Sequence, residues 1–323
     1  MQRLPGAEMR ENMAITAAMV KELREMTGAG MMDCKKALNE TNGNMEEAVE
    51  FLRKNGQAKA EKKAGRIAAE GICSIATAGD KVAAVVEVNS ETDFVAKNAD
   101  FQKYVADVAK QAVESDAEDM DAFLAEAWNA DPSKTVKDAL VEKIAVIGEN
   151  LNIRRFKKVT AEDGFVATYV HGGGRIGVIV EAASDVVNDD VKEAMVNIAM
   201  QIAALNPKYV ATSDVSEEYK AHEMEIISAQ IAQDPKMVGK PEKVINGAVI
   251  GRLNKELKEV CLLEQVYVKA EDGKQTVAQY IAQVGKANNA ALSVKSFVRF
   301  ETGEGLEKKN ENFAAEVAAQ MGL

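Results

Sequence analysis

Histidine and cysteine are scarce in this sequence of 323 residues, and their scarcity argues against several classes of enzyme. The only histidines are His171 and His222, whereas many hydrolases and metalloenzymes depend on imidazole groups. The cysteines are Cys34, Cys73 and Cys261, without C-x-x-C spacing. This pattern excludes a disulfide framework and a cysteine-based zinc site, and it fits a reducing compartment.

Long apolar runs and an excess of basic residues are also missing. No run approaches the roughly 20 residues of a membrane span, and the N-terminus has no apolar signal segment, so we expect a cytoplasmic protein with no membrane partner. The net charge is −11, from 40 Lys and Arg against 51 Asp and Glu, which disfavours direct nucleic-acid binding. Hydrophobic residues make up 47%, enough for a substantial core.

Helical periodicity and capping signals predict a small three-helix domain near the N-terminus. The expected helices are 17–26, 31–39 and 45–54, with Thr16 and Asn44 as N-caps. Gly56 is expected to end the third helix. The expected core consists of Val20, Leu23, Cys34, Ala37, Leu38, Ala48, Val49 and Leu52.

A strand–turn–strand–helix pattern occurs twice. Residues 71–77 and 82–88 are expected to form a hairpin before a helix capped by Asn98, and residues 165–170 and 176–182 form another before a helix at 190–205. In an alignment of the second strand of each hairpin, Val86 coincides with Val180 and Glu87 with Glu181. We infer a duplicated unit in which each helix packs on its own sheet.

The remaining patterns predict more helix than strand. Helices are expected at 120–128, 136–147, 215–233, 241–263, 276–287 and 312–321, and strands at 151–159, 266–268 and 292–300. The fold class is therefore α+β with antiparallel sheets. The expected domains are a disordered leader (1–12), a three-helix domain (13–56), a linker (57–68), a first core half (69–160), a second core half (161–207 and 265–301), an inserted helical hairpin (208–264) and a C-terminal helical module (302–323).

The glycine-rich segment 172–177 matches G-x-G-x-x-G, but a strand rather than a helix is expected after it. A dinucleotide site needs the helix N-terminus at that point, so we predict a hairpin turn instead. His171, beside this turn, is more plausible as a partner contact or structural residue than as a base. The basic cluster 154–158 suits either phosphate contacts or, more often, a solvated strand edge.

Residues 91–98 (ETDFVAKN) connect a buried strand to a helix and allow two interpretations. In the local one, Thr92 or Asp93 satisfies backbone N–H groups and Phe94 tucks under the helix. In the functional one, the loop presents an aromatic ring beside a carboxylate on a firm scaffold, as binding loops do. From the residues alone, the local interpretation is favoured.

Long motifs follow one another in order between residues 20 and 317. They are Val20–Arg24, Thr27–Leu38, Glu87–Asn89 leading into Thr92–Lys97, Gly148–Arg155, His171–Gly177, Phe297–Phe300 and Phe313–Val317. Together they resemble the bacterial elongation factor Ts family, and the resemblance covers essentially everything after Met13. It implies a ubiquitin-associated-like N-terminal domain, a pseudo-symmetric core, an inserted helical hairpin and a C-terminal helix.

The resemblance also implies a function. The protein would bind the GDP-bound GTPase elongation factor Tu, displace its Mg²⁺ and promote GDP release, so that GTP can bind during translation elongation. Such an exchange factor is not an enzyme, and it needs no catalytic residue, metal or cofactor of its own. The implied magnesium-displacing residues are Thr92, Asp93, Phe94 and Val95, with Phe94 as the wedge. Further implied contacts are Arg24, Met31, Met32, His171, Phe313 and Val317.

Two other classes of function stay open from the residues. One is an adaptor whose three-helix domain binds a ubiquitin-like or other partner. The other is a thiol enzyme that uses Cys34 or Cys73, for which no activating neighbour is visible.

Overall fold

The computed structural model describes residues 15–308, which begin with a bundle of three helices. These are α1 (Ala17–Thr27), α2 (Met31–Glu40) and α3 (Met45–Lys63). Thr16 and Asn44 cap α1 and α3 through side-chain oxygens, as predicted. The predicted core is confirmed: the buried residues are Val20, Leu23, Cys34, Ala37, Leu38 and Ala48, and Val49 and Leu52 pack against them.

The predicted end of the third helix at Gly56 is wrong, because α3 continues to Lys63. Gly56 is buried against α7 (Val136–Ile147), and a Cβ placed on it would lie 3.6 Å from the Cβ of Ala145. A glycine inside a helix costs only about 1 kcal/mol, which this packing offsets. Much of the expected linker is therefore helical.

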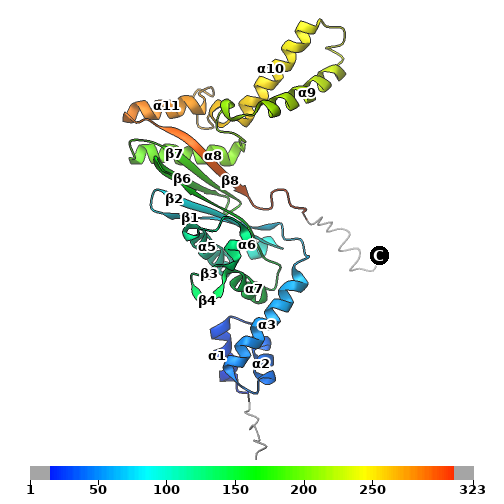
Figure 1. Cartoon of the computed structure of the whole chain (residues 1–323), viewed down its shortest axis with the longest axis vertical. Helices are drawn as coiled ribbons and strands as arrows, with labels where there is room; N and C mark the ends of the chain where they lie inside the picture. Colours follow the sequence, from blue (N-terminus) through cyan, green and yellow to red (C-terminus); the bar gives the residue numbers. More distant parts are fainter. Residues whose placement is uncertain (1–14, 309–323) are drawn as a thin grey trace, which may run out of the picture.

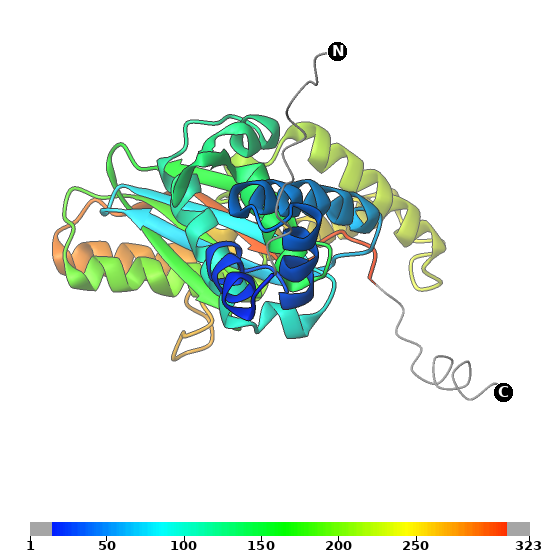
Figure 2. The same cartoon turned by 90° about the horizontal axis from the view of Figure 1, so that it is seen from below.

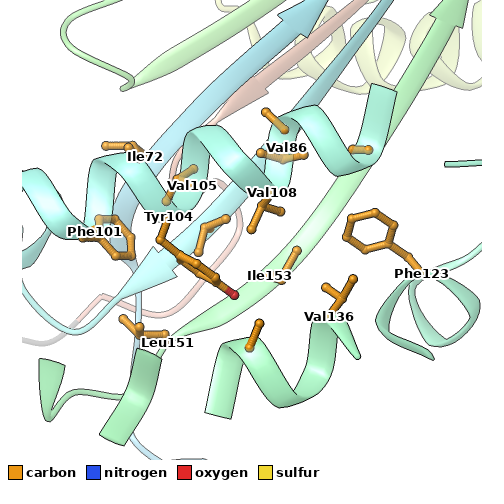
Figure 3. Close-up of a cluster of buried hydrophobic side chains, with 14 of the residues drawn as sticks. Ile72, Val86, Phe101, Tyr104, Val105, Val108, Phe123, Val136, Leu151 and Ile153 are labelled. Atoms are coloured by element: carbon orange, nitrogen blue, oxygen red, sulfur yellow. The ribbon is translucent and has the colours of Figure 1, made fainter. Parts of the chain in front are cut away.

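The first sheet has the strand order β1-β2-β5, with antiparallel pairing throughout. Its strands are β1 (Glu70–Ala78), β2 (Val82–Ser90) and β5 (Asn152–Thr160), and α5 (Ala99–Glu114) packs on one face. Asn98 caps α5 as predicted. Figure 3 shows Phe101, Tyr104 and Val108 of α5 pointing into an apolar cluster with Val86 and Ile153 from the strands.

The helix predicted over 120–128 is too long. The observed α6 ends earlier (Met120–Ala125), and β3 (Ala127–Trp128) then pairs with β4 (Asp131–Thr135). The buried side chain of Gln111 holds this segment extended: its Nε2 donates to the Ala127 carbonyl (3.2 Å) and its Oε1 accepts from the Asn129 N–H (2.8 Å). A tertiary contact thus overrides a sequence that is compatible with helix.

The second sheet has the order β6-β7-β8, again antiparallel. Its strands are β6 (Gly164–His171), β7 (Ile176–Ala183) and β8 (Ser293–Glu301), and it packs against α8 (Asp189–Leu205), which in turn contacts α11 (Val277–Asn288). The predicted strand 266–268 is absent from the described residues apart from a single bridge between Val266 and Thr276. Here the side chain of Gln201 binds the backbone of Val266 and Val268, so no partner strand is needed.

The two sheets share irregularities at matching positions. A register shift follows Glu87 in β2 and Glu181 in β7. Gly71 and Gly164 both have positive φ, and each lies directly over a backbone carbonyl of the neighbouring strand. Gln111 and Gln201 both bind backbone groups two residues apart, as described above.

The sheets pack face to face and α5 and α8 cover their outer faces, which gives four layers (Figure 1). The residues between the sheets include Val85, Ile179 and Phe300. The helical bundle lies at one end of the molecule. Two long helices, α9 (Glu217–Gln233) and α10 (Glu242–Val260), form a hairpin that projects from the other end. Figure 2 shows this hairpin extending to one side of the sheets.

The two helices of the hairpin pack through an apolar seam, in which Val249, Leu253 and Leu257 are buried against Ile227 and Ile231. The structure is thus a mixed α+β fold with N-terminal helices and small antiparallel sheets. Within residues 15–308, no helix combines the length and apolarity needed to cross a bilayer. The predicted leader 1–12 and terminal helix 312–321 lie outside the described residues.

Candidate functional site

The segment 91–98, here called the 91–98 loop, connects β2 to α5 and contains the short helix α4 (Asp93–Ala96). The Thr92 hydroxyl caps α4 by accepting from the Val95 N–H at 3.4 Å, as the local interpretation predicted. The same interpretation is wrong for Phe94, whose side chain does not tuck under a helix. Phe94 is 81% exposed, and no other large apolar side chain in the described residues is as exposed.

The side chain of Glu149 binds the first two residues of the 91–98 loop. Its carboxylate accepts three hydrogen bonds, from the N–H groups of Glu91 and Thr92, each at 3.1 Å, and from the Thr92 hydroxyl at 2.7 Å. Glu149 directly follows Gly148, whose left-handed conformation ends α7. The end of one helix therefore anchors the start of the loop that carries Phe94.

Asp93 lies beside the exposed ring and forms an ion pair with Lys97 at 2.6 Å. The hydrogen bond from Lys97 is the main reason that the pKa of Asp93 lies below its ordinary value. Both side chains stay largely open to solvent. The loop therefore presents a charged carboxylate next to an apolar wedge.

The glycine-rich turn lies next to the loop. Asp93 and Lys97 line one depression together with Gly172, Gly173 and Arg175 of the turn. The turn connects two antiparallel strands, which confirms the predicted hairpin and removes the dinucleotide interpretation. It is anchored to the first sheet by the N–H of Cys73, which donates to the Gly174 carbonyl at 2.6 Å.

The other predicted contact residues fall on separate surfaces. His171 is exposed at the end of β6, and its Nδ1 lies 2.9 Å from the Tyr169 hydroxyl. Arg24, Met31 and Met32 lie on the helical bundle, where Met31 is 59% and Met32 75% exposed. Phe313 and Val317 lie outside the described residues.

Two arginines of the basic cluster 154–158 are used internally, whereas Lys157 is exposed. Glu87 is buried in β2 and accepts from Arg154, Arg155, the Asn89 amide and the Gly303 N–H. Burial by itself raises the pKa of Glu87, but the Gly303 N–H, the Asn89 amide and Arg155 outweigh it, so the pKa lies below its ordinary value. The network ties the turn after β8 to the first sheet, and the solvated-edge interpretation is wrong for both arginines.

Among the described residues, no three or more His, Cys, Asp or Glu side chains come together in a group that could hold a metal ion. Burial raises the pKa of Cys34, and that of Cys73 to about 11, which opposes thiolate formation. Sequence reasoning missed the anchoring role of Glu149 and the network around Glu87. The sequence features that could have revealed these roles are the helix-ending glycine before Glu149 and the carboxylate of Glu87 within an apolar strand.

The fold presents an exposed aromatic ring beside a carboxylate, an arrangement that is typical of protein-binding surfaces. Comparison with known proteins gives the family. A family model described as Elongation factor TS matches residues 91–304. The chain is 52% identical to elongation factor Ts of Clostridioides difficile over 95% of this chain and 99% of the relative. It is 50% identical to elongation factor Ts of Clostridium novyi with the same coverage.

The chain belongs to the elongation factor Ts family. It is therefore a nucleotide exchange factor of translation elongation, its partner is the GTPase elongation factor Tu, and it is not an enzyme.

Proposed function

We propose that the 91–98 loop drives exchange: Phe94 inserts into elongation factor Tu beside its magnesium site, and Asp93 assists. Thr92 caps the loop and Val95 packs beneath it. The observation that carries this proposal is the exposure of Phe94 on a loop held by three hydrogen bonds to one carboxylate. Mg²⁺ bridges phosphate and protein oxygens in nucleotide sites, so its displacement loosens GDP.

Linkage explains why insertion accelerates exchange. A factor that binds the nucleotide-free GTPase better than the GDP-bound form must weaken GDP binding by the same factor. Each ~1.4 kcal/mol of differential affinity changes nucleotide affinity about tenfold. No covalent bond is made or broken during exchange. GDP release is therefore promoted only by contacts that the factor makes with the nucleotide-free GTPase and not with the GDP-bound form.

We further propose that the remaining predicted surfaces extend this interface. Arg24, Met31 and Met32 would dock the helical bundle on the nucleotide-binding domain. The exposure of both methionines supports this role, because flexible thioether side chains suit binding surfaces. His171 would contact a second region of the partner, whereas Phe313 and Val317 would contact the nucleotide-binding domain, as the helical bundle does. The site of action would be the cytoplasm, where translation elongation takes place.

We also propose a division of the chain into domains. The bundle would be a ubiquitin-associated-like domain (13–56), and the two sheets with their helices would be duplicated halves (69–160, and 161–207 with 265–301). The hairpin would be an insertion (208–264), followed by a C-terminal helical module (302–323). The matching register shifts, positive-φ glycines and buried glutamines support the duplication.

Phe94→Ala is expected to slow GDP release strongly. Truncation of a central aromatic anchor costs about 2 kcal/mol, which corresponds to roughly a 30-fold slower stimulated release. Asp93→Ala is expected to cause a smaller loss, about tenfold, because its charge is solvated. The measurement is stopped-flow release of fluorescently labelled GDP from elongation factor Tu at subsaturating factor.

The matched control is Val238→Ala, which trims another exposed apolar side chain, 73% exposed, in the segment between α9 and α10. It should leave release unchanged. Full stimulation by both loop variants would disprove the wedge. Binding that ignores the nucleotide state of the GTPase would favour the adaptor class instead.

A further inference from the structure

We propose that Glu149 is a positioning residue for exchange: it holds the 91–98 loop in the conformation that presents Phe94, without contacting the partner itself. This inference rests on the function proposed for Phe94. In this role, the turn after α7, which carries Glu149, keeps Phe94 in its binding conformation before the partner binds.

The geometry of the Glu149 carboxylate supports this role. One oxygen accepts from two successive backbone N–H groups, those of Glu91 and Thr92, and the other accepts from the Thr92 hydroxyl. Hydrogen bonds to an ionised carboxylate are roughly twice as strong as neutral ones. Thr92 is the N-cap of α4, so the carboxylate places the residue from which the helix carrying Phe94 starts.

A second hydrogen bond joins the same two segments with the roles of donor and acceptor exchanged. The Glu91 carboxylate accepts from the Asn150 N–H at 2.6 Å, so residues 91 and 149–150 bind each other reciprocally. Asn150 is buried, and its Nδ2 donates to the Arg66 carbonyl at 2.8 Å. Arg66 follows α3 closely in the chain. The turn after α7 thus connects three segments: the chain leaving the helical bundle, the end of α7 and the loop.

Preorganisation matters here because α4 has only four residues. A helix of one turn is not stable by itself, since nucleation fixes several dihedral angles for one hydrogen bond. Without the carboxylate, the loop would have to be ordered during binding, and that entropy cost would be subtracted from the affinity for the nucleotide-free GTPase. By linkage, the same amount is lost from the weakening of GDP binding.

The test compares Glu149→Ala with Asp138→Asn in the GDP-release assay with the full chain. Asp138 is a close chemical match, because it accepts from the N–H (3.0 Å) and hydroxyl (2.9 Å) of one threonine, Thr135, at the opposite end of α7. Glu149→Ala should slow stimulated release about tenfold. Glu149→Gln keeps one acceptor oxygen and should be intermediate, whereas Asp138→Asn should be normal.

Two readouts separate positioning from general destabilisation. Amide hydrogen exchange of Glu91 and Thr92 should accelerate in Glu149→Ala and stay protected in Asp138→Asn. In a Phe94→Ala background, adding Glu149→Ala should change release by less than the roughly tenfold expected in the wild-type background, because the contribution that acts through the ring is already gone.

The outcomes distinguish the two proposals. Normal release by Glu149→Ala beside slow release by Phe94→Ala overturns the positioning role alone. The same holds if the two substitutions are fully additive. Normal release by both variants overturns the wedge and, with it, this inference.

Discussion

Glu87→Ala is expected to destabilise the core by about 3 kcal/mol, the lower end of the cost of removing one partner from a buried ion pair. The substitution leaves the guanidinium groups of Arg154 and Arg155 and the N–H of Gly303 without their shared acceptor. The arginines keep some contact with solvent, which limits the penalty. The midpoint of thermal unfolding by calorimetry measures the loss.

Glu181→Ala is the matched control, since Glu181 occupies the corresponding position in β7. It is only partly buried and accepts one side-chain hydrogen bond, from Ser296 at 2.6 Å. Its loss should cost roughly 1 kcal/mol. Equal effects of the two substitutions would contradict the importance assigned to the arginine network.

The Glu87 network also makes stability depend on pH. The folded-state pKa of Glu87 lies below its ordinary value of 4.5, so the folded protein holds the charged form more strongly than the unfolded chain does. This contribution is fully present above pH 4.5 and is lost as the pH falls through the folded-state pKa. We therefore expect the difference in unfolding midpoint between the wild type and Glu87→Gln to shrink as the pH falls through the folded-state pKa of Glu87. Calorimetric scans at a series of pH values measure this difference.

Gly164→Ala is expected to be comparably damaging, at about 3 kcal/mol, because it combines backbone strain with overpacking. Gly164 has φ +142°, and an added Cβ would overlap the backbone carbonyl oxygen of Ala182. Because that atom belongs to the central strand of the sheet, it cannot move aside as a flexible side chain would. Calorimetry should show a lower unfolding midpoint, and Gly71→Ala in the first sheet should behave alike.

Gly79→Ala separates the two causes. Gly79 also has positive φ, at +64°, but nothing lies within 4 Å of an added Cβ. It should cost only about 1 kcal/mol, the strain of a left-handed alanine. If Gly79→Ala and Gly164→Ala destabilise equally, steric overlap is not the cause.

Local signals in the sequence were sufficient for most elements. The caps Thr16, Asn44 and Asn98 hydrogen-bond to backbone N–H groups within their own helices, so their role is readable from neighbours in the chain. The apolar, β-prone runs and the glycines between them likewise predicted both hairpins. These are interactions over a few residues, which one sequence contains in full.

The errors arose where distant residues decide the local structure. Gly56 continues a helix because α7 packs against it, and residues 127–129 are extended because Gln111 binds their backbone. Nothing within several residues of either segment signals these partners. Propensity is a weak prior, and tertiary contacts override it.

For the site, the residues by themselves placed an aromatic ring and a carboxylate in the loop between β2 and α5, and the ordered motifs identified the family. From the residues alone, however, the favoured interpretation tucked Phe94 under the helix, whereas its side chain is exposed. Only the tertiary structure decided that, because exposure depends on how Glu149, more than fifty positions further along the chain, holds the loop. Sequence determined which groups are available, and the packing of distant segments determined which of them face a partner, since burial is a property of the whole fold.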